Sequence, residues 1–202
     1  MKPVLSLGAS ASAMVTRRNT AVSEAAPCGR FVVEHWRGGK RINEYHFPNA
    51  VTNEGKNFLL GVMFKGATQK TAWYLGLISG TGYTALAATD TYDDIDQAGN
   101  GWDEFAAYTD PANSNSATTR PAWIMGSVSA QSLTSSAVSV FDITGAGTVK
   151  GLFAVAGAAA AQTKSDHTPG SYLWATALFT AGDVTVTNGD QLKVTYTTAA
   201  SA

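Results

Sequence analysis

The chain has 202 residues, enough for one substantial β-sandwich or barrel that needs no disulfide or metal to hold its core together. Its charge is sparse and balanced: 14 Lys and Arg stand against 15 Asp and Glu, and 14% of residues are charged where about 25% is typical. The balance of charges excludes nucleic-acid binding that depends on an excess of basic residues. The low number of charges favours a surface that is partly covered by other protein molecules. No apolar run is long enough for a transmembrane helix, and the single cysteine, Cys28, cannot close an intrachain disulfide.

Residues 1–28 differ from the rest, because Ala, Ser and Thr dominate them and their apolar residues follow no period. The start, MKPVLSLG followed by ASASA, superficially resembles a secretory signal, but its apolar part is short and broken, so we expect none. Such a composition is typical of a disordered tail. We instead predict an extended arm that lies across a neighbouring subunit, with the basic pair Arg17 and Arg18 as candidate interface residues.

The compact part, predicted as one domain over residues 29–202, opens with a hairpin. Residues 29–36 and 40–47 are rich in β-branched and aromatic residues and flank Gly38-Gly39, a dipeptide suited to a two-residue turn with positive φ. Alternation along the first strand predicts one buried face and one face that meets a partner. The candidate interface residues in this strand are Phe31, Val33 and Trp36.

One helix is predicted near residues 53–65. Thr52 or Asn53 can cap its start, and Gly66 stands where a glycine commonly ends a helix. The apolar residues expected to pack against the protein recur at helical spacing and are Phe58, Leu59, Val62 and Met63. Two internal glycines cost about 1 kcal/mol each relative to alanine, so the helix depends on tertiary contacts.

The remaining chain reads as strands separated by polar turns. Strands are expected at 73–78, 122–128, 137–144, 147–156, 172–180 and 191–198, and the Asn188-Gly189 dipeptide predicts a hairpin before the last of them. Residues 90–104 form an acidic irregular stretch, and residues 157–170 an exposed loop in which Ala158–Ala161 could form a helical turn. The fold class is therefore mainly β, a β-sandwich of jelly-roll-like type with one short helix.

No pattern for catalysis or metal binding stands out. A calcium loop starting at Asp94 fails, because Ala98 and Phe105 occupy its fifth and twelfth positions. His35 and His46 can lie on paired strands without a third ligand, so we expect these two and His167 to be ordinary strand or surface histidines. Cys28 has no evident base that would make it a nucleophile. Five tryptophans are spread singly along the chain, which favours core or subunit contacts over a sugar platform. We expect no catalytic residue, no cofactor and no metal.

Several segments resemble structural proteins of tailed bacteriophages, in particular capsid decoration or cement proteins and some tail components. The resemblance covers residues 30–198 and lies in the segments PNAVTNEGKNFLL (48–60), WYLGL (73–77), GWDEF (101–105), RPAW (120–123), GTVKG (147–151) and LWATALF (173–179). These are packing and turn motifs. The resemblance implies a jelly-roll or related β-sandwich.

It also implies a function, which we state as an expectation. A decoration protein would bind the outer surface of the major capsid protein lattice as a dimer or trimer and stabilise the head by thermodynamic linkage. It would be assembled in the host bacterial cytoplasm and reside on the capsid exterior, without nucleic-acid or membrane contacts. The alternatives are a tail, tail-fibre or head–tail connector protein, and a glycan-binding module of the virion surface.

Overall fold

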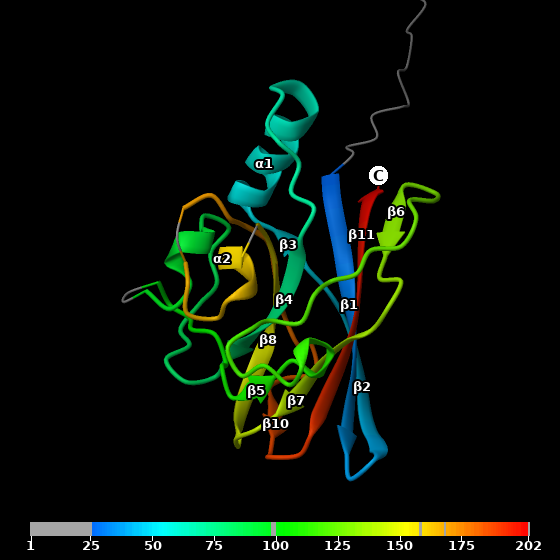
Figure 1. The fold of residues 1–202 in the computed structure, drawn as a ribbon, viewed down its shortest axis with the longest axis vertical. Coiled ribbons are helices and arrows are strands. Elements are labelled where there is room, and N and C mark those ends of the chain that lie inside the picture. The colour runs from blue at the N-terminus through cyan, green and yellow to red at the C-terminus, as the bar shows by residue number, and fades with distance from the viewer. Residues whose placement is uncertain (1–25, 98–99, 158, 168, 202) are drawn as a thin grey trace, which may run out of the picture.

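The computed structural model describes residues 26–97, 100–157, 159–167 and 169–201, and folds them into two antiparallel sheets (Figure 1). The first sheet has the order β2 (Lys40–Pro48), β1 (Ala26–Arg37), β11 (Gln191–Ser201), β7 (Ser139–Ile143), β5 (Tyr108–Thr109), and β6 (Ser132–Thr134) also pairs with β11. The second has the order β10 (Val184–Val186), β8 (Gly147–Ala156), β9 (Tyr172–Leu178), β3 (Ala50–Val51), with β4 (Trp73–Ser79) paired to β8. The helices are α1 (Asn53–Phe64) and α2 (Ala159–Gln162), with 3-10 turns at Tyr92–Asp94 and Pro111–Asn113. The predicted β-sandwich is confirmed.

The two sheets differ in how they are buried, and the sequence explains the difference. Along β1 buried and half-buried residues alternate, because one face of the first sheet meets the core and the other meets solvent. In β8 and β4 most residues are buried, on both faces, because the outer face of the second sheet is covered by a second apolar cluster. That cluster includes Tyr92, Ile95, Trp102 and Ala161, which come from the loop after β4 and from α2. The continuous apolar runs of β4 and β8 follow from this double coverage.

The first hairpin forms as predicted. β1 and β2 pair in antiparallel register around Gly38 and Gly39, whose φ values are 55° and 74°. Glycine adopts such positive values at both turn positions without strain. A register shift at His35/Trp36 introduces a bulge near the turn. β1 also pairs with β11 along its whole length, so Cys28 and its neighbours, expected in the arm, belong to the sheet.

Helix α1 forms where it was predicted and is held by its first turn. The Thr52 hydroxyl accepts a hydrogen bond from the Gly55 amide (3.0 Å) and donates one to the Leu173 carbonyl (2.5 Å). Gly55 lies so close to β9 that a Cβ there would sit 2.5 Å from the Trp174 carbonyl oxygen. The Glu54 carboxylate accepts from the amides of Tyr92 and Leu173, at 2.8 and 2.6 Å.

One prediction about this helix is wrong in detail. Phe58 is buried and Leu59 and Val62 are half-buried as expected, but Met63 lies on the solvent-facing side. The reason is that Gly55 and Phe58 set the packed face against β9, which leaves the Leu60, Met63 and Phe64 positions pointing away from the protein.

Two predictions from turn and strand patterns are also wrong. β10 and β11 do not form a hairpin: β10 pairs with β8 in the second sheet and β11 with β1 in the first, so the turn at Gly189 crosses between sheets. Residues 122–128 make only isolated bridges, at Ala122 and Met125. In the segment 157–170, the helical turn considered near Ala158–Ala161 is found as α2 (Ala159–Gln162), and it buries Ala161, so this segment is not wholly an exposed loop.

Candidate functional site

A cluster of charged side chains is buried between the loops that cover the second sheet. At its centre Glu104 and Arg120 form an ion pair in which neither side chain has solvent-exposed area. Arg120 Nη2 donates to Glu104 Oε2 at 2.7 Å, and Nε lies 3.1 Å from both carboxylate oxygens. Arg120 Nη1 donates to the Ala161 carbonyl at 2.8 Å, and the Tyr108 hydroxyl donates to Glu104 Oε1 at 2.7 Å. The pair therefore joins three segments that are distant in sequence.

The surroundings shift the protonation of the groups around this pair. Burial alone would lower the pKa of Arg120, but the attraction of Glu104 outweighs it and raises the pKa above the ordinary value. Burial raises the pKa of Tyr108 well above its usual range. Burial lowers the pKa of Lys164, whose ammonium donates to the carbonyls of Ala106 and Tyr108, both at 2.8 Å. Because its pKa is raised, the Arg120 guanidinium stays charged.

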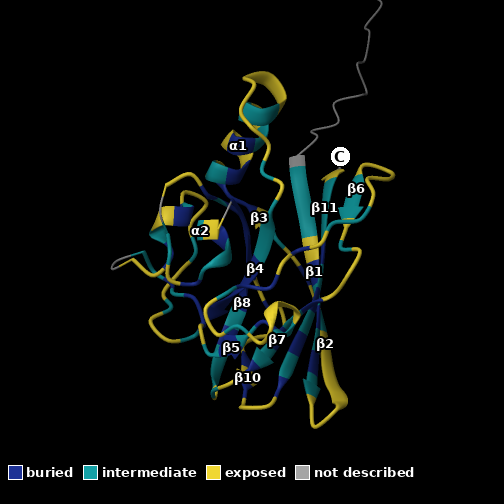
Figure 2. Ribbon diagram, viewed as in Figure 1, coloured by how far each residue is buried: buried dark blue, intermediate teal, exposed yellow. Residues whose placement is uncertain are grey.

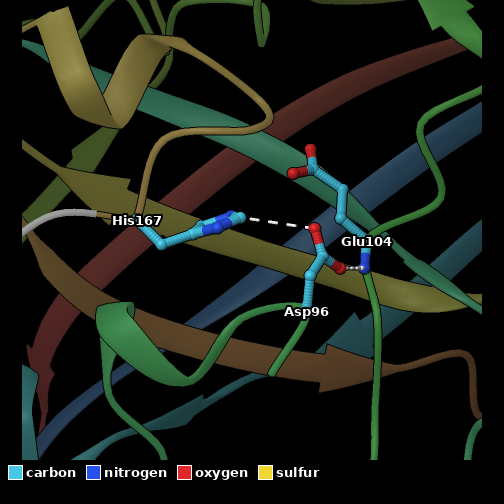
Figure 3. Close-up of side chains that lie close together, drawn as sticks. All are labelled: Asp96, Glu104 and His167. Carbon is cyan, nitrogen blue, oxygen red and sulfur yellow. Dashed lines mark hydrogen bonds and ion pairs between the residues drawn. The ribbon is translucent and has the colours of Figure 1, made fainter. Parts of the chain in front are cut away.

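His167 and Asp96 lie at the edge of this cluster (Figure 3). His167 Nε2 is 3.3 Å from Arg120 Nη2 and 3.7 Å from Asp96 Oδ2. Because a guanidinium can only donate, the contact with Arg120 requires an imidazole without a proton on Nε2. Burial, followed by the charge of Arg120, lowers the pKa of His167, in agreement with this geometry. Asp96 Oδ1 accepts from the Glu104 amide at 2.5 Å.

The donor atoms of Asp96, Glu104 and His167 lie within 4.8 Å of one another, a grouping that can hold a metal ion. Arg120 argues against that use here. Its guanidinium already binds both oxygens of Glu104 and faces the His167 nitrogen. A metal ion among these donors would lie against a fixed positive charge. We interpret the cluster as a structural ion-pair network that fastens the loops to the second sheet.

The sequence pattern does not indicate this ion-pair network. Glu104, Arg120 and His167 share no spacing, and only the tertiary fold brings them together. His35 and His46, which lie on the paired strands β1 and β2, point to opposite faces of the hairpin. The exposed fractions are 3% for His35 and 58% for the side chain of His46.

A second charged group closes the end of the sandwich near the β1–β2 turn. The buried Asp190 carboxylate accepts from Arg37 Nε and Nη2, both at 2.7 Å, and from the Thr187 amide at 2.9 Å. His35 Nε2 lies 2.9 Å from the same carboxylate. The hydrogen bonds from Arg37 hold the pKa of Asp190 well below its usual range. This group ties the crossing between β10 and β11 to the first hairpin.

The predicted interface residues fall in three different places. Phe31 and Val33 are fully buried between the sheets, so the prediction that they meet a partner is wrong; their face of β1 is the core face. Trp36 lies half-buried on the outer face, where its Nε1 donates to Glu34 at 2.8 Å and Lys193 Nζ lies 4.0 Å from its ring centroid. Arg17 and Arg18 lie outside the described residues.

An apolar surface lies at the end of the molecule that carries α1. The side chains of Leu60, Met63 and Phe64 are 53%, 65% and 74% exposed, and their spacing puts them on one stripe of the helix. We call this stripe the α1 stripe. Figure 2 shows the tip of α1 as an exposed projection, close to the end where β1 begins and β11 ends. Exposed large apolar side chains in such a group mark interaction sites.

A groove of about 200 Å³ lies behind the α1 stripe, between the packed face of α1 and the ends of β6 and β11. Aromatic and aliphatic side chains line it, including Phe58, Trp73, Trp123, Trp174 and Leu133. The Trp123 indole N–H is buried and makes no hydrogen bond within the described part of the chain. Apolar side chains thus dominate both the projection and the recess at this end.

No family model, no curated protein and no solved structure matches this chain. Among the described residues, no helix has the length and apolar character needed to cross a bilayer.

Proposed function

We propose that this chain is a structural protein of the tailed-bacteriophage virion, a decoration protein that binds the outer surface of the major capsid protein lattice. The observation that carries the proposal is the α1 stripe, an exposed group of large apolar side chains beside an aromatic groove. The low charge of the chain, at 14% charged residues, agrees with a surface that other protein covers. The resemblance of residues 30–198 to phage decoration proteins supplies the choice of partner.

The proposed role is to bind the capsid lattice, and this role requires no chemical reaction. A protein that binds only the assembled lattice stabilises that lattice by its binding free energy, repeated over many copies. The two-sheet body supplies a rigid support, since α1 is fastened to β9 and to the Tyr92 turn by Thr52 and Glu54. We assign no chemical step to the Glu104–Arg120 cluster.

The test is reconstitution on capsids that lack this protein. The purified chain is added to such capsids, and sedimentation measures uptake while thermal melting measures shell stability. We expect uptake and a higher melting temperature of the shell. Capsids that neither take up the chain nor gain stability would refute the proposal.

The tail, tail-fibre or connector role remains the alternative within the virion. The number of copies per particle separates the two, because a shell protein is present in hundreds of copies and a tail protein in far fewer. Quantitative mass spectrometry of purified virions against the major capsid protein makes the measurement.

A second candidate, glycan binding, is favoured by the outer face of the first sheet. There Trp36 lies beside Glu34, which also accepts from Arg41 at 3.0 Å. An aromatic ring with carboxylate and guanidinium neighbours suits sugar hydroxyls, although Lys193 already covers the Trp36 ring at 4.0 Å. A glycan array probed with the intact chain and with Trp36→Ala tests it: a ligand lost in the variant supports glycan binding, and no ligand rejects it.

A further inference from the structure

The charged side chains that flank the α1 stripe in the sequence are basic. Lys56 lies one turn before Leu60 on the exposed side of the helix, and Lys65 directly follows Phe64. Lys70, in the segment that returns to β4, places its ammonium 5.5 Å from the Tyr172 ring centroid. Lys56 and Lys65 therefore flank the stripe along the helix, and Lys70 adds a third cation near the base of α1, beside Tyr172.

Among the described residues, the helix after its first turn and the segment that follows it carry no carboxylate that offsets these cations. Asp93 and Asp94 lie near Glu54, in the first turn of α1, whereas Lys65 follows the last turn. Within residues 53–72 the only acidic residue is Glu54, and its carboxylate is turned inward onto the amides of Tyr92 and Leu173. The neighbouring segments 123–137 and 195–201, which contribute Leu133 and Thr198 to the groove, contain no charged residue.

We infer that the α1 stripe docks onto a protein surface whose apolar centre is bordered by Asp and Glu side chains, and that it does not dock onto a second copy of itself. The inference rests on the proposed function in naming a shell protein as the bearer of that surface. A two-fold contact through the α1 stripe would bring the lysines of the two copies near one another, and residues 55–72 supply no acid to pair with them. A partner with an acidic border pairs each cation instead.

A protein partner fits better than a membrane. An interfacial helix needs a long continuous apolar face, whereas only Leu60, Met63 and Phe64 are exposed and large on α1. The opposite side of the helix is committed to the protein, because Gly55 and Phe58 are buried there. About one and a half turns of α1 therefore remain available for binding, a length that suits insertion into a groove on a folded protein.

The test uses the full chain and capsids lacking it, with two variants and two matched controls. The first variant is Met63→Ser with Phe64→Ser, and the second is Lys56→Gln, Lys65→Gln and Lys70→Gln together. The controls, Ile42→Ser and Lys40→Gln, change an exposed apolar and a basic residue near the β1–β2 turn, at the opposite end of the molecule (Figure 1). Thermal unfolding of each isolated variant verifies that it folds.

We expect the apolar variant to bind capsids at least tenfold more weakly, as loss of central apolar anchors does at other interfaces. The lysine variant should bind about tenfold more weakly at low salt and show a smaller dependence on salt than the unchanged chain. The controls should bind normally. Zero-length carbodiimide cross-linking of decorated capsids should join Lys56, Lys65 or Lys70 to acidic residues of the shell protein.

The outcomes separate the inference from the proposed function. If the unchanged chain does not bind capsids at all, the proposed function fails. If it binds but both variants bind equally well, or if the lysines cross-link to a second copy of this chain, the inference fails and the function stands. Sedimentation with phosphatidylserine vesicles, used as a membrane probe, would also overturn the inference if the unchanged chain bound them and the Met63/Phe64 variant did not.

Discussion

Arg120 illustrates how a charge can be kept in a protein interior. Its donors reach Glu104, the Ala161 carbonyl and the Tyr92 hydroxyl, and the last contact is 3.3 Å long. A buried ion pair contributes little compared with an apolar pair of the same size, but removing one partner leaves an uncompensated charge. The cost of a substitution here therefore depends on what is left behind.

We predict that Arg120→Met lowers the free energy of unfolding by about 3–5 kcal/mol, because it leaves the Glu104 carboxylate buried without a cation. Urea denaturation provides the measurement. Adding Glu104→Gln to Arg120→Met should restore part of the loss, since the unpaired Glu104 charge is then removed. Arg41→Met is the control, because its ion pairs with Glu34 and Glu44 are exposed. A loss at Arg120 no larger than at Arg41 would contradict our interpretation of the cluster.

A pH dependence is expected at His167. Burial and the adjacent Arg120 lower its pKa in the folded state, while the unfolded chain has a histidine pKa of about 6.5. The unfolded state therefore binds the proton more readily, and the free energy of unfolding falls as pH drops below about 6.5 toward the folded-state pKa. Asp96 contributes with the opposite sign at lower pH, because burial raises its pKa.

The measurement is chemical denaturation between pH 7.5 and 5. Replacing His167 by Gln should flatten the decline, because the variant has no group there to protonate. An identical slope in the His167 variant would exclude this residue as the source.

At the scale of elements, the start of α1 is the most testable feature. Thr52→Ala removes both the cap on the Gly55 amide and the bond to the Leu173 carbonyl, so we expect a loss of about 1–2 kcal/mol in unfolding free energy. Thr52→Ser keeps the hydroxyl and should lose much less. Thermal or urea unfolding of both variants, with the exposed Thr68→Ala as control, makes the comparison. Equal losses for Ala and Ser would show that the hydroxyl is not what holds the helix.

Elements set by local signals were predictable from the sequence. The Gly38-Gly39 turn, the Thr52 cap and the apolar run of β8 each depend on residues adjacent in the chain, and all three are found. The Asn188-Gly189 dipeptide also marks a turn, but it does not specify which sheet receives the next strand. Here the buried Asp190 fixes the turn to Arg37 and His35, and the chain changes sheets.

The buried face of β1 and the buried Glu104–Arg120 cluster could not be predicted from local sequence signals. Alternation in β1 separates Phe31 and Val33 from Trp36, but it does not say which side other strands will cover. Likewise the partners of Arg120 lie 16 and 47 residues away, at Glu104 and His167, so no spacing rule connects them. The exposure of Met63 follows from how α1 docks on β9, a contact between distant parts of the chain.

At the scale of the whole molecule, the two sheets should differ in stability. β8 lies between β4 and β9 and is covered on both faces, whereas β2 is an edge strand whose residues are mostly exposed. We predict that amides of residues 151–155 exchange with solvent only through near-global unfolding, and those of residues 40–46 through local opening. Hydrogen–deuterium exchange mass spectrometry follows both peptides in one experiment. Equal protection of the two segments would contradict this ordering.

The register of β1 against β11 has a practical consequence. Ala26 pairs with Ser201, so the chain enters and leaves the sandwich side by side, at the end that carries α1 (Figure 1). A fluorescent protein or epitope fused after Ser201 would crowd the very surface that we assign to the shell. The Gly38-Gly39 turn lies at the other end, with open space around both glycines. Cargo for display on a decorated particle is therefore better inserted in that turn than attached to the tail of the chain.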